Sequence, residues 1–205
     1  MYPFLHSKAV GELEKHINSQ SGIQIISICG GSCSGKTTLC EYLQACGIGN
    51  VLSMDSFYKP ITEISLFRPG IPAFDTPDAF DLNLIIDSLI KVKQGITVQH
   101  PVYEYSNLPS GRDITKYKTF VPASVNLFDG ILSYCNELIP YVDYAVYVDR
   151  PDTARRTSRI ARDTVERGVT SERVATLYDQ MVRPLHNHFI LPQKNLSLFV
   201  IKNES

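Results

Sequence analysis

The residues best suited to chemistry lie in the stretch ICGGSCSGKTTLC, residues 28–40. Gly30, Gly35, Lys36 and Thr37 fit the pattern G-x-x-x-x-G-K-[ST], whose backbone N–H groups can surround a phosphate chain at a helix N-terminus. The lysine can reach the terminal phosphates, and the threonine hydroxyl can bind Mg²⁺. We therefore predict a nucleotide-binding loop made of Gly30, Gly31, Ser32, Cys33, Ser34, Gly35, Lys36, Thr37 and Thr38.

This loop lies between two segments that can hold it in place. Residues 22–29 have the apolar character of a buried strand, and residues 36–47 are typical of a helix that ends at Gly47. A strand, a glycine-rich loop and a helix in this order are the context that the phosphate-binding motif requires. A chance glycine-rich turn is the alternative, and it requires no such context.

Strands and helices are predicted to alternate along the rest of the chain, which indicates a parallel sheet in a three-layer α/β/α fold of the P-loop NTPase type. The further predicted strands are 50–55, 124–132, 143–149 and 196–203, and the further helices are 81–95 and 151–168. Two β-patterned runs within 96–122 predict an inserted hairpin. We expect a single domain over residues 1–205, with ligands at the carboxyl ends of the strands.

Two aspartates follow predicted strands at the edge where phosphates are expected. Asp55 comes at the end of the second strand, where it could accept a proton from an attacking hydroxyl. Asp129 comes after an apolar run and fits the acidic group that holds Mg²⁺ in phosphate-transfer sites. Either residue alone could instead be a helix cap or a turn residue. Together with the phosphate loop, they indicate phosphoryl transfer.

A helix rich in arginine supplies candidate phosphate contacts. Arg155, Arg159 and Arg162 have i, i+4 and i+7 spacing, so they share one face of the predicted helix 151–168. A solvated charged face is the ordinary explanation for such a run. The helix carries only a few acidic residues to balance the arginines, so we expect a cationic face suited to a triphosphate in transfer.

The segment after the arginine helix is a candidate lid. Residues 171–189 are amphipathic and contain Pro184, which predicts a kinked or two-part helix. We expect the region 155–190 to cover the phosphates, exclude water and protect ATP from hydrolysis. His186 and His188 are two residues apart on this helix and therefore point to different sides, which argues against a metal pair.

Composition excludes several other classes of protein. The 20 basic and 21 acidic residues leave no broad cationic surface for nucleic acid. No apolar stretch is long enough to span a bilayer, and the first residues lack the apolar segment of a signal peptide, so we expect a cytoplasmic protein without a membrane partner. The five cysteines show no CxxC spacing, so free thiols are expected.

Seven ordered motifs make the chain resemble the uridine kinase family, within the superfamily shared with phosphoribulokinase. They are GGSCSGKTT, DSFYK, FDTPDAFD, PVYEY, LFDGIL, RIARDTVERG and VRPLHNHFILPQK. The resemblance implies that Asp55 is the catalytic base, and that Asp75 holds the ribose hydroxyls. It also implies that Tyr103 contacts the nucleobase and that Asp129 helps to bind Mg²⁺. Arg155 and Arg159 would lie near the substrate and the phosphates.

Some residues depart from that family. Uridine kinases usually carry a base-reading histidine a few residues after the hairpin tyrosine, where this chain has Leu108 or a neighbour. Asp129 stands in place of a glutamate that is one methylene longer, which leaves direct and water-mediated metal contact as alternatives. Arg173 stands where a substrate-facing glutamine is common, so we count it among the substrate-binding candidates.

These observations predict an ATP-dependent, Mg²⁺-requiring kinase acting on the 5′-hydroxyl of a nucleoside. Lys36, Asp55 and Arg159 would be catalytic; Asp75, Tyr103, Arg155, Arg162 and Arg173 would bind substrate; Thr37 and Asp129 would bind the metal. The alternatives are a kinase of the same superfamily for nicotinamide riboside, pantothenate or a sugar phosphate, and a non-catalytic nucleotide-binding regulator. The sequence leaves open whether the chain forms a homo-oligomer.

Overall fold

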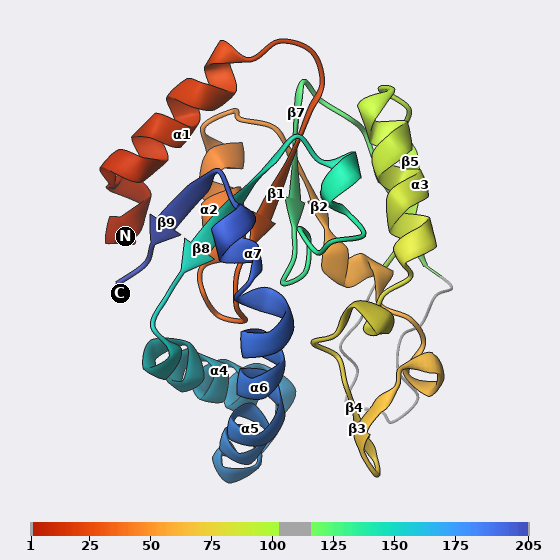
Figure 1. The fold of residues 1–205 in the computed structure, drawn as a ribbon, viewed down its shortest axis with the longest axis vertical. Coiled ribbons are helices and arrows are strands. Elements are labelled where there is room, and N and C mark those ends of the chain that lie inside the picture. The colour runs from red at the N-terminus through yellow and green to blue at the C-terminus, as the bar shows by residue number, and fades with distance from the viewer. Residues whose placement is uncertain (1, 103–115, 205) are drawn as a thin grey trace.

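A five-stranded, fully parallel sheet forms the centre of the molecule in a computed structural model that describes residues 2–102 and 116–204 (Figure 1). The strand order is β2-β7-β1-β8-β9. The strands are β1 (Gln24–Cys29), β2 (Asn50–Ser53), β7 (Val125–Asp129), β8 (Tyr144–Asp149) and β9 (Phe199–Lys202). Because all five strands run the same way, the segments that follow them meet at one edge of the sheet.

Helices cover both faces of this sheet. Helices α1 (Lys8–Ser19) and α2 (Lys36–Ala45) pack on one face, and α3 (Leu82–Lys93) packs on the other. The central strand β1 supplies both cores, because successive side chains of a strand point to opposite faces: Ile26 and Ile28 face α2, whereas Ile25 faces α3. The predicted three-layer α/β/α class is confirmed.

A group of helices lies beyond the carboxyl ends of the strands, in the lower part of Figure 1. It begins with α4 (Asp152–Arg167), which ends at Gly168 in the left-handed conformation, and continues with α5 (Ser171–Leu177). The chain then stays helical through two π-helical turns, Tyr178–Val182 and His186–Ile190, on either side of α6 (Arg183–Leu185). Pro184 cannot donate a helix hydrogen bond, which accounts for the altered helical geometry around it.

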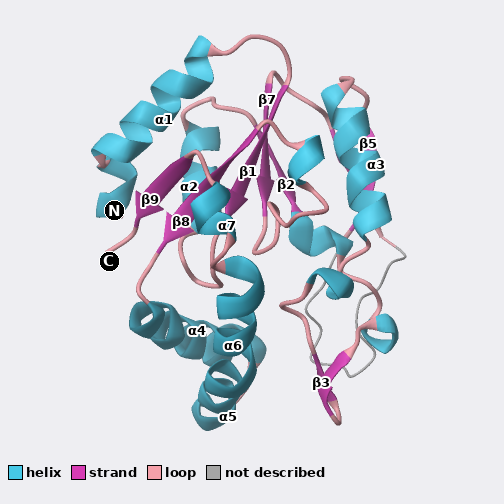
Figure 2. Ribbon diagram, viewed as in Figure 1, coloured by secondary structure: helices cyan, strands magenta, loops and turns pink. Residues whose placement is uncertain are grey.

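Two small antiparallel pairs stand beside the sheet (Figure 2). Strands β5 (Val98–Pro101) and β6 (Tyr117–Phe120) form the hairpin that was predicted within 96–122. Strands β3 (Leu66–Arg68) and β4 (Ile71–Pro72) form a second pair that the sequence patterns did not indicate. Helix α1 was not predicted either.

All five predicted strands of the sheet were longer than the observed ones, and three of the differences have a local cause. Residues 54 and 55 belong to a 3₁₀ turn, Met54–Phe57, because the Ser53 hydroxyl accepts a hydrogen bond from the Asp55 amide and turns the chain. The strand predicted over 124–132 ends at Asp129, where Gly130 packs against Met54. The strand predicted over 196–203 starts only at Phe199, because a short helix, α7 (Gln193–Leu196), precedes it. No helix in the described parts of the chain is long and apolar enough to cross a membrane.

Candidate active site

The phosphate loop connects β1 to α2 and is fixed by backbone conformation and by its neighbours. Gly35 has φ +103°, a left-handed value that side chains rarely tolerate, and a Cβ there would lie 2.7 Å from Asn203 Nδ2. The same Asn203 amide nitrogen donates a hydrogen bond to the Ser34 carbonyl at 2.8 Å. Asn203 follows β9, so the end of the last strand supports the loop that follows the first. The sequence motif gave no sign of this contact.

Lys36 and Thr37 stand at the start of α2, facing the end of β7. The Lys36 ammonium is buried and donates to the Gly31 carbonyl at 3.0 Å. The Thr37 hydroxyl donates to Asp129 Oδ2 at 2.9 Å, which brings together the two residues that were predicted to bind the metal. Burial raises the pKa of Asp129 to about 6, the Lys36 ammonium opposes that shift, and the Asp55 carboxylate adds to it.

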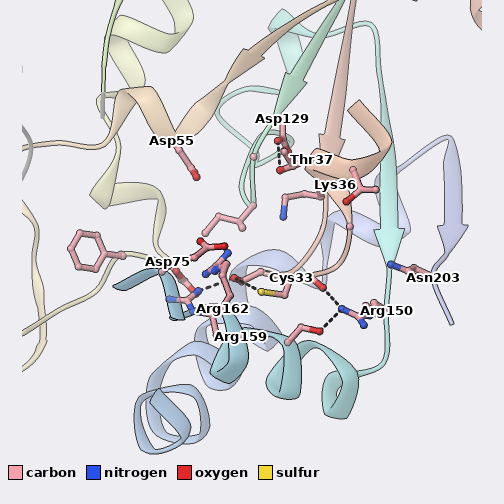
Figure 3. Close-up of a pocket in the computed structure, with 18 of the residues that line it drawn as sticks. Cys33, Lys36, Thr37, Asp55, Asp75, Asp129, Arg150, Arg159, Arg162 and Asn203 are labelled. Atoms are coloured by element: carbon pink, nitrogen blue, oxygen red, sulfur yellow. Dashed lines mark hydrogen bonds between the residues drawn. The ribbon is translucent and has the colours of Figure 1, made fainter. Parts of the chain in front are cut away.

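A cavity of about 840 Å³ opens beside this loop (Figure 3). Lys36, Thr37 and Asp129 line its middle, and Asp55 and Asp75 lie together on one side of them in the close-up. Asp55 follows β2, as expected, and points into the cavity. The structure therefore gathers the predicted base, the phosphate loop and the predicted metal-binding residues around one space.

Asp75 belongs to the loop between β4 and α3 and is 5% exposed. Burial raises the pKa of its carboxyl group, and the nearby Arg159 guanidinium opposes that shift. Its Oδ2 atom has no hydrogen-bond partner. A buried carboxylate oxygen without a partner costs free energy, so the arrangement suits a ligand that donates a hydrogen bond there.

The arginines of α4 share an acidic partner that the sequence reading overlooked. Asp163 is buried and accepts hydrogen bonds from Arg159 at 2.6 Å, Arg162 at 2.9 Å and Arg167 at 3.4 Å. Burial opposes ionisation of Asp163, but the three guanidinium groups together hold its pKa below the usual value. Arg159 also donates to the Ser32 hydroxyl at 2.7 Å, which ties this helix to the phosphate loop. Asp163 could have been identified from the sequence, because Arg159 and Arg167 each lie four residues from it and Arg162 is its neighbour.

Arg155 and Arg173 lie outside the cavity lining. Arg155 is 4% exposed and sits behind the phosphate loop, where its Nη1 would lie 2.5 Å from a Cβ placed on Gly31. Its Nε donates to the Arg150 carbonyl at 3.1 Å. Arg173 is exposed on α5. Tyr103 falls outside the described residues. Arg159 and Arg162 do line the cavity.

The two histidines of the lid have different surroundings, as their spacing predicted. His186 is buried beside Arg155 and Gly31, and His188 is exposed. The described residues contain no group of three or more His, Cys, Asp or Glu side chains that could hold a metal ion. A hydroxyl and a single carboxylate, as Thr37 and Asp129 provide, suit Mg²⁺, which keeps several of its waters.

The buried polar atoms without partners concentrate around the phosphate loop. Within the described ranges they are Ser34 Oγ, Asp75 Oδ2, Asp129 Oδ1, Arg155 Nη1 and His186 Nδ1. Proteins rarely leave such atoms unsatisfied. The donor set of backbone N–H groups, Lys36 and Arg159 fits a polyphosphate, and the Thr37 and Asp129 oxygens fit a divalent cation beside it.

The loop, the parallel sheet and the helices at its carboxyl edge define a phosphate-loop nucleotide-binding protein. The chain belongs to the phosphoribulokinase / uridine kinase family, whose model matches residues 25–204. This confirms the resemblance that the sequence motifs indicated.

Two curated relatives illustrate the similarity. The uridine kinase of Staphylococcus haemolyticus is 33% identical over 181 residues, which cover 86% of this chain and 86% of that protein. Mouse uridine-cytidine kinase-like 1 is 37% identical over 186 residues, which cover 88% of this chain but only 33% of the mouse protein. This chain therefore spans about a third of the length of the mouse relative.

Solved structures agree on the fold. Phosphoribulokinase from Rhodobacter spheroides superposes with a TM-score of 0.65 at 17% identity, covering 89% of this chain and 71% of that one. D-glycerate 3-kinase from Cryptococcus neoformans superposes with a TM-score of 0.63 at 16% identity, and the match covers 88% of this chain and 85% of that one. Similarity at this level of identity concerns the fold alone.

Proposed function

We propose that this protein is an ATP-dependent kinase that phosphorylates the 5′-hydroxyl of a pyrimidine nucleoside. One observation carries the proposal: the cavity has a phosphate loop with Lys36 in its middle and the carboxylates of Asp55 and Asp75 on one side. A donor phosphate and an acceptor hydroxyl can therefore meet between them. The nucleoside as acceptor is supported by the names of the curated relatives, which include uridine kinases that this chain matches over most of its length.

The acceptor hydroxyl would be activated by Asp55. In the reaction, an O–P bond forms between that hydroxyl and the terminal phosphorus, and the bond to the bridging oxygen of the leaving diphosphate breaks. The hydroxyl proton passes to the Asp55 carboxylate. Lys36 and Arg159 balance the negative charge on the transferred group, because both line the cavity beside the loop.

Magnesium would be held by Thr37 and Asp129. When bound, the ion would neutralise charge on the donor phosphates. The Thr37–Asp129 hydrogen bond and the unpartnered Asp129 Oδ1 support this assignment, since a bound cation would give that buried oxygen a partner. We also assign Asp75 to the ribose hydroxyls, because its buried, unpartnered oxygen needs a donor. The remaining predicted substrate-binding residues stay predictions: Tyr103, Arg155, Arg162 and Arg173.

Helices α4, α5 and α6 would shield the reacting atoms from water. They lie beyond the carboxyl edge of the sheet, and Arg159 joins α4 to Ser32 of the phosphate loop. Water that reached the terminal phosphate would compete with the acceptor hydroxyl.

The test is an assay of ADP release with ATP and Mg²⁺ against a panel of uridine, cytidine, nicotinamide riboside, pantothenate and sugar phosphates. The proposal expects the strongest stimulation by a pyrimidine nucleoside, and loss of that stimulation in Lys36→Ala. Stimulation by another member of the panel alone would replace the proposed substrate. A protein that binds ATP but responds to no acceptor would contradict the proposed kinase activity.

A further inference from the structure

The cavity continues past the phosphate loop to an end that lies away from Asp55 and Asp75. Among the residues that line the cavity, Phe4 and Asn203 flank Gly35, and Tyr2 lies beside Phe4. In the close-up, Arg150 and Asn203 lie on the side of Lys36 opposite Asp55 and Asp75 (Figure 3). The cavity thus has an acceptor side and a second side, with the phosphate loop between them.

The second side is where the nucleoside part of a bound donor nucleotide has to lie. Lys36 reaches the terminal phosphates, and the terminal phosphate must face the acceptor side if Asp55 is the base. The remaining phosphates follow the loop toward the start of α2, so the attached nucleoside leaves the loop in the other direction. The walls it meets there include two aromatic side chains.

Those aromatic side chains come from a part of the chain that precedes the residues matched by the family model. The family model starts at residue 25, whereas Phe4 belongs to a 3₁₀ turn, Pro3–His6, that precedes α1, and Tyr2 is the residue just before that turn. The turn is firmly attached: Phe4 is 5% exposed, and its ring edge would lie 3.1 Å from a Cβ on Gly35. The Leu5 amide donates to the Tyr2 carbonyl at 3.1 Å, so Tyr2 is held to the same turn.

Tyr2 is held by this turn and is nevertheless exposed. Its side chain is 56% exposed although it borders a cavity, and its ring centroid lies 6.4 Å from that of Phe4 at an interplanar angle of 59°. The lining of the cavity also includes the Arg150 guanidinium, which is fixed by hydrogen bonds to the Cys33 carbonyl and the Ser158 hydroxyl, both at 2.9 Å. Aromatic rings and guanidinium planes are surfaces on which heterocyclic bases stack.

We propose that Tyr2, supported by Phe4, forms an aromatic wall for the nucleobase of the phosphate-donor nucleotide. The proposal rests on the proposed function, because it takes the donor to be a nucleoside triphosphate. It adds a donor-binding role for the segment before α1, outside the residues that the family model matches. Since every base offers a flat face, the wall strengthens binding of nucleotides over inorganic polyphosphate without selecting strongly among bases.

A tryptophan reporter tests this directly, because the chain contains no tryptophan. Tyr2→Trp would install the sole indole at the proposed contact, and His6→Trp would place one on the same turn, at an exposed residue that does not line the cavity. The fluorescence of Tyr2→Trp should be quenched by ATP and not by tripolyphosphate. The fluorescence of His6→Trp should respond to neither. Equal responses of the two variants to ATP would overturn the proposal.

Affinity measurements give an independent result. By calorimetry, Tyr2→Ala should bind ATP about five- to tenfold more weakly than the parent, the size expected for one lost stacking contact. Its affinity for tripolyphosphate should be unchanged, and His6→Ala should match the parent with both ligands. Unchanged ATP affinity in Tyr2→Ala would overturn the aromatic wall and leave the proposed function standing. If the parent binds neither ligand, both the wall and the proposed function fail.

Discussion

Asp55 follows β2 and Asp129 ends the neighbouring strand β7, and their different surroundings support the different roles proposed for them. Asp129 is 7% exposed and accepts a hydrogen bond from Thr37 at the start of α2, as a metal-binding carboxylate beside the phosphate loop should. Asp55 is only partly buried and lies beyond the strand end in a 3₁₀ turn, on the acceptor side of the cavity. At the scale of single residues, position relative to Lys36 separates the proposed base from the proposed metal ligand.

Replacing Asp55 with asparagine should remove the base without disturbing the loop. The amide cannot accept the hydroxyl proton, so we expect turnover to fall by about 10² to 10⁴. Asparagine makes the same local turn contacts, so ATP affinity should change little. Turnover and nucleotide affinity measured side by side check both parts, and turnover within a few-fold of the parent would remove Asp55 as the base.

Gly31 should be intolerant of any side chain. A Cβ at this position would lie 2.5 Å from Arg155 Nη1 and 3.0 Å from the His186 ring, both of which are buried. Gly31→Ala should therefore cost about 1–3 kcal/mol of stability through overpacking and weaken ATP binding. Gly11→Ala in α1 is the matched control, because a Cβ there meets nothing within 4 Å. Equal melting temperatures for the two variants would contradict the tight packing behind the loop.

At the scale of elements, α4 is organised by one acidic residue. Asp163 holds three arginines, and one of them, Arg159, also reaches Ser32 of the phosphate loop. The carboxylate therefore fixes the direction in which the cationic side chains point. The arginine-rich sequence suggested a helix with too few acids, whereas the structure shows that a single buried acid is shared.

Asp163→Asn should disturb this helix strongly. Loss of the charge leaves three guanidinium groups without their common partner, and we expect about 2 kcal/mol of lost stability together with weaker ATP binding. Asp87→Asn is the control, because Asp87 pairs with Lys91 on the exposed surface of α3 and should change stability by only about 0.5 kcal/mol. Denaturant unfolding of both variants checks the difference, and similar losses would count against Asp163 as the organising residue.

Sequence patterns predicted the elements that depend on local signals. The strand before Gly30, the helix after Lys36 and the helix that stops at Gly168 were recognisable because apolar runs, glycine and proline act within a few residues. The hairpin was also predicted, and its two strands pair as expected, although Tyr103 falls outside the described residues. Contacts between distant segments were not predictable. The hydrogen bond from Asn203 to the Ser34 carbonyl joins positions that are 169 residues apart, and no spacing rule relates them.

At the scale of the whole molecule, the helical segment proposed as a lid and the phosphate loop meet at a buried histidine, His186. Burial lowers the pKa of His186 to about 4, and the positive charge of Arg155 adds to this shift. His186 is therefore neutral in the folded protein at neutral pH. The unfolded chain binds the proton with an ordinary pKa near 6.5. Protonation favours unfolding, so this contribution to stability is complete above pH 6.5 and is lost as pH falls from about 6.5 toward 4.

His186→Gln should make stability less sensitive to acid. The parent should lose about 2 kcal/mol from this residue alone between pH 7 and pH 5, and the variant should not. His188→Gln is the matched control, because His188 is exposed two residues further along and should leave the parent's pH dependence unchanged. Melting temperatures across this range test the difference between the three proteins. If the melting temperatures of His186→Gln and the parent fall in parallel as the pH is lowered, His186 is not held neutral by burial.

The central claim is transfer of a phosphoryl group from ATP to a nucleoside. It is tested most directly by incubating the protein with γ-labelled ATP, Mg²⁺ and uridine, and by identifying the labelled product. The account predicts that the label appears in uridine 5′-monophosphate in amounts that match the ADP formed, and that Lys36→Ala forms neither product. Label recovered only as inorganic phosphate, or ATP left intact while the nucleotide is bound, would contradict it.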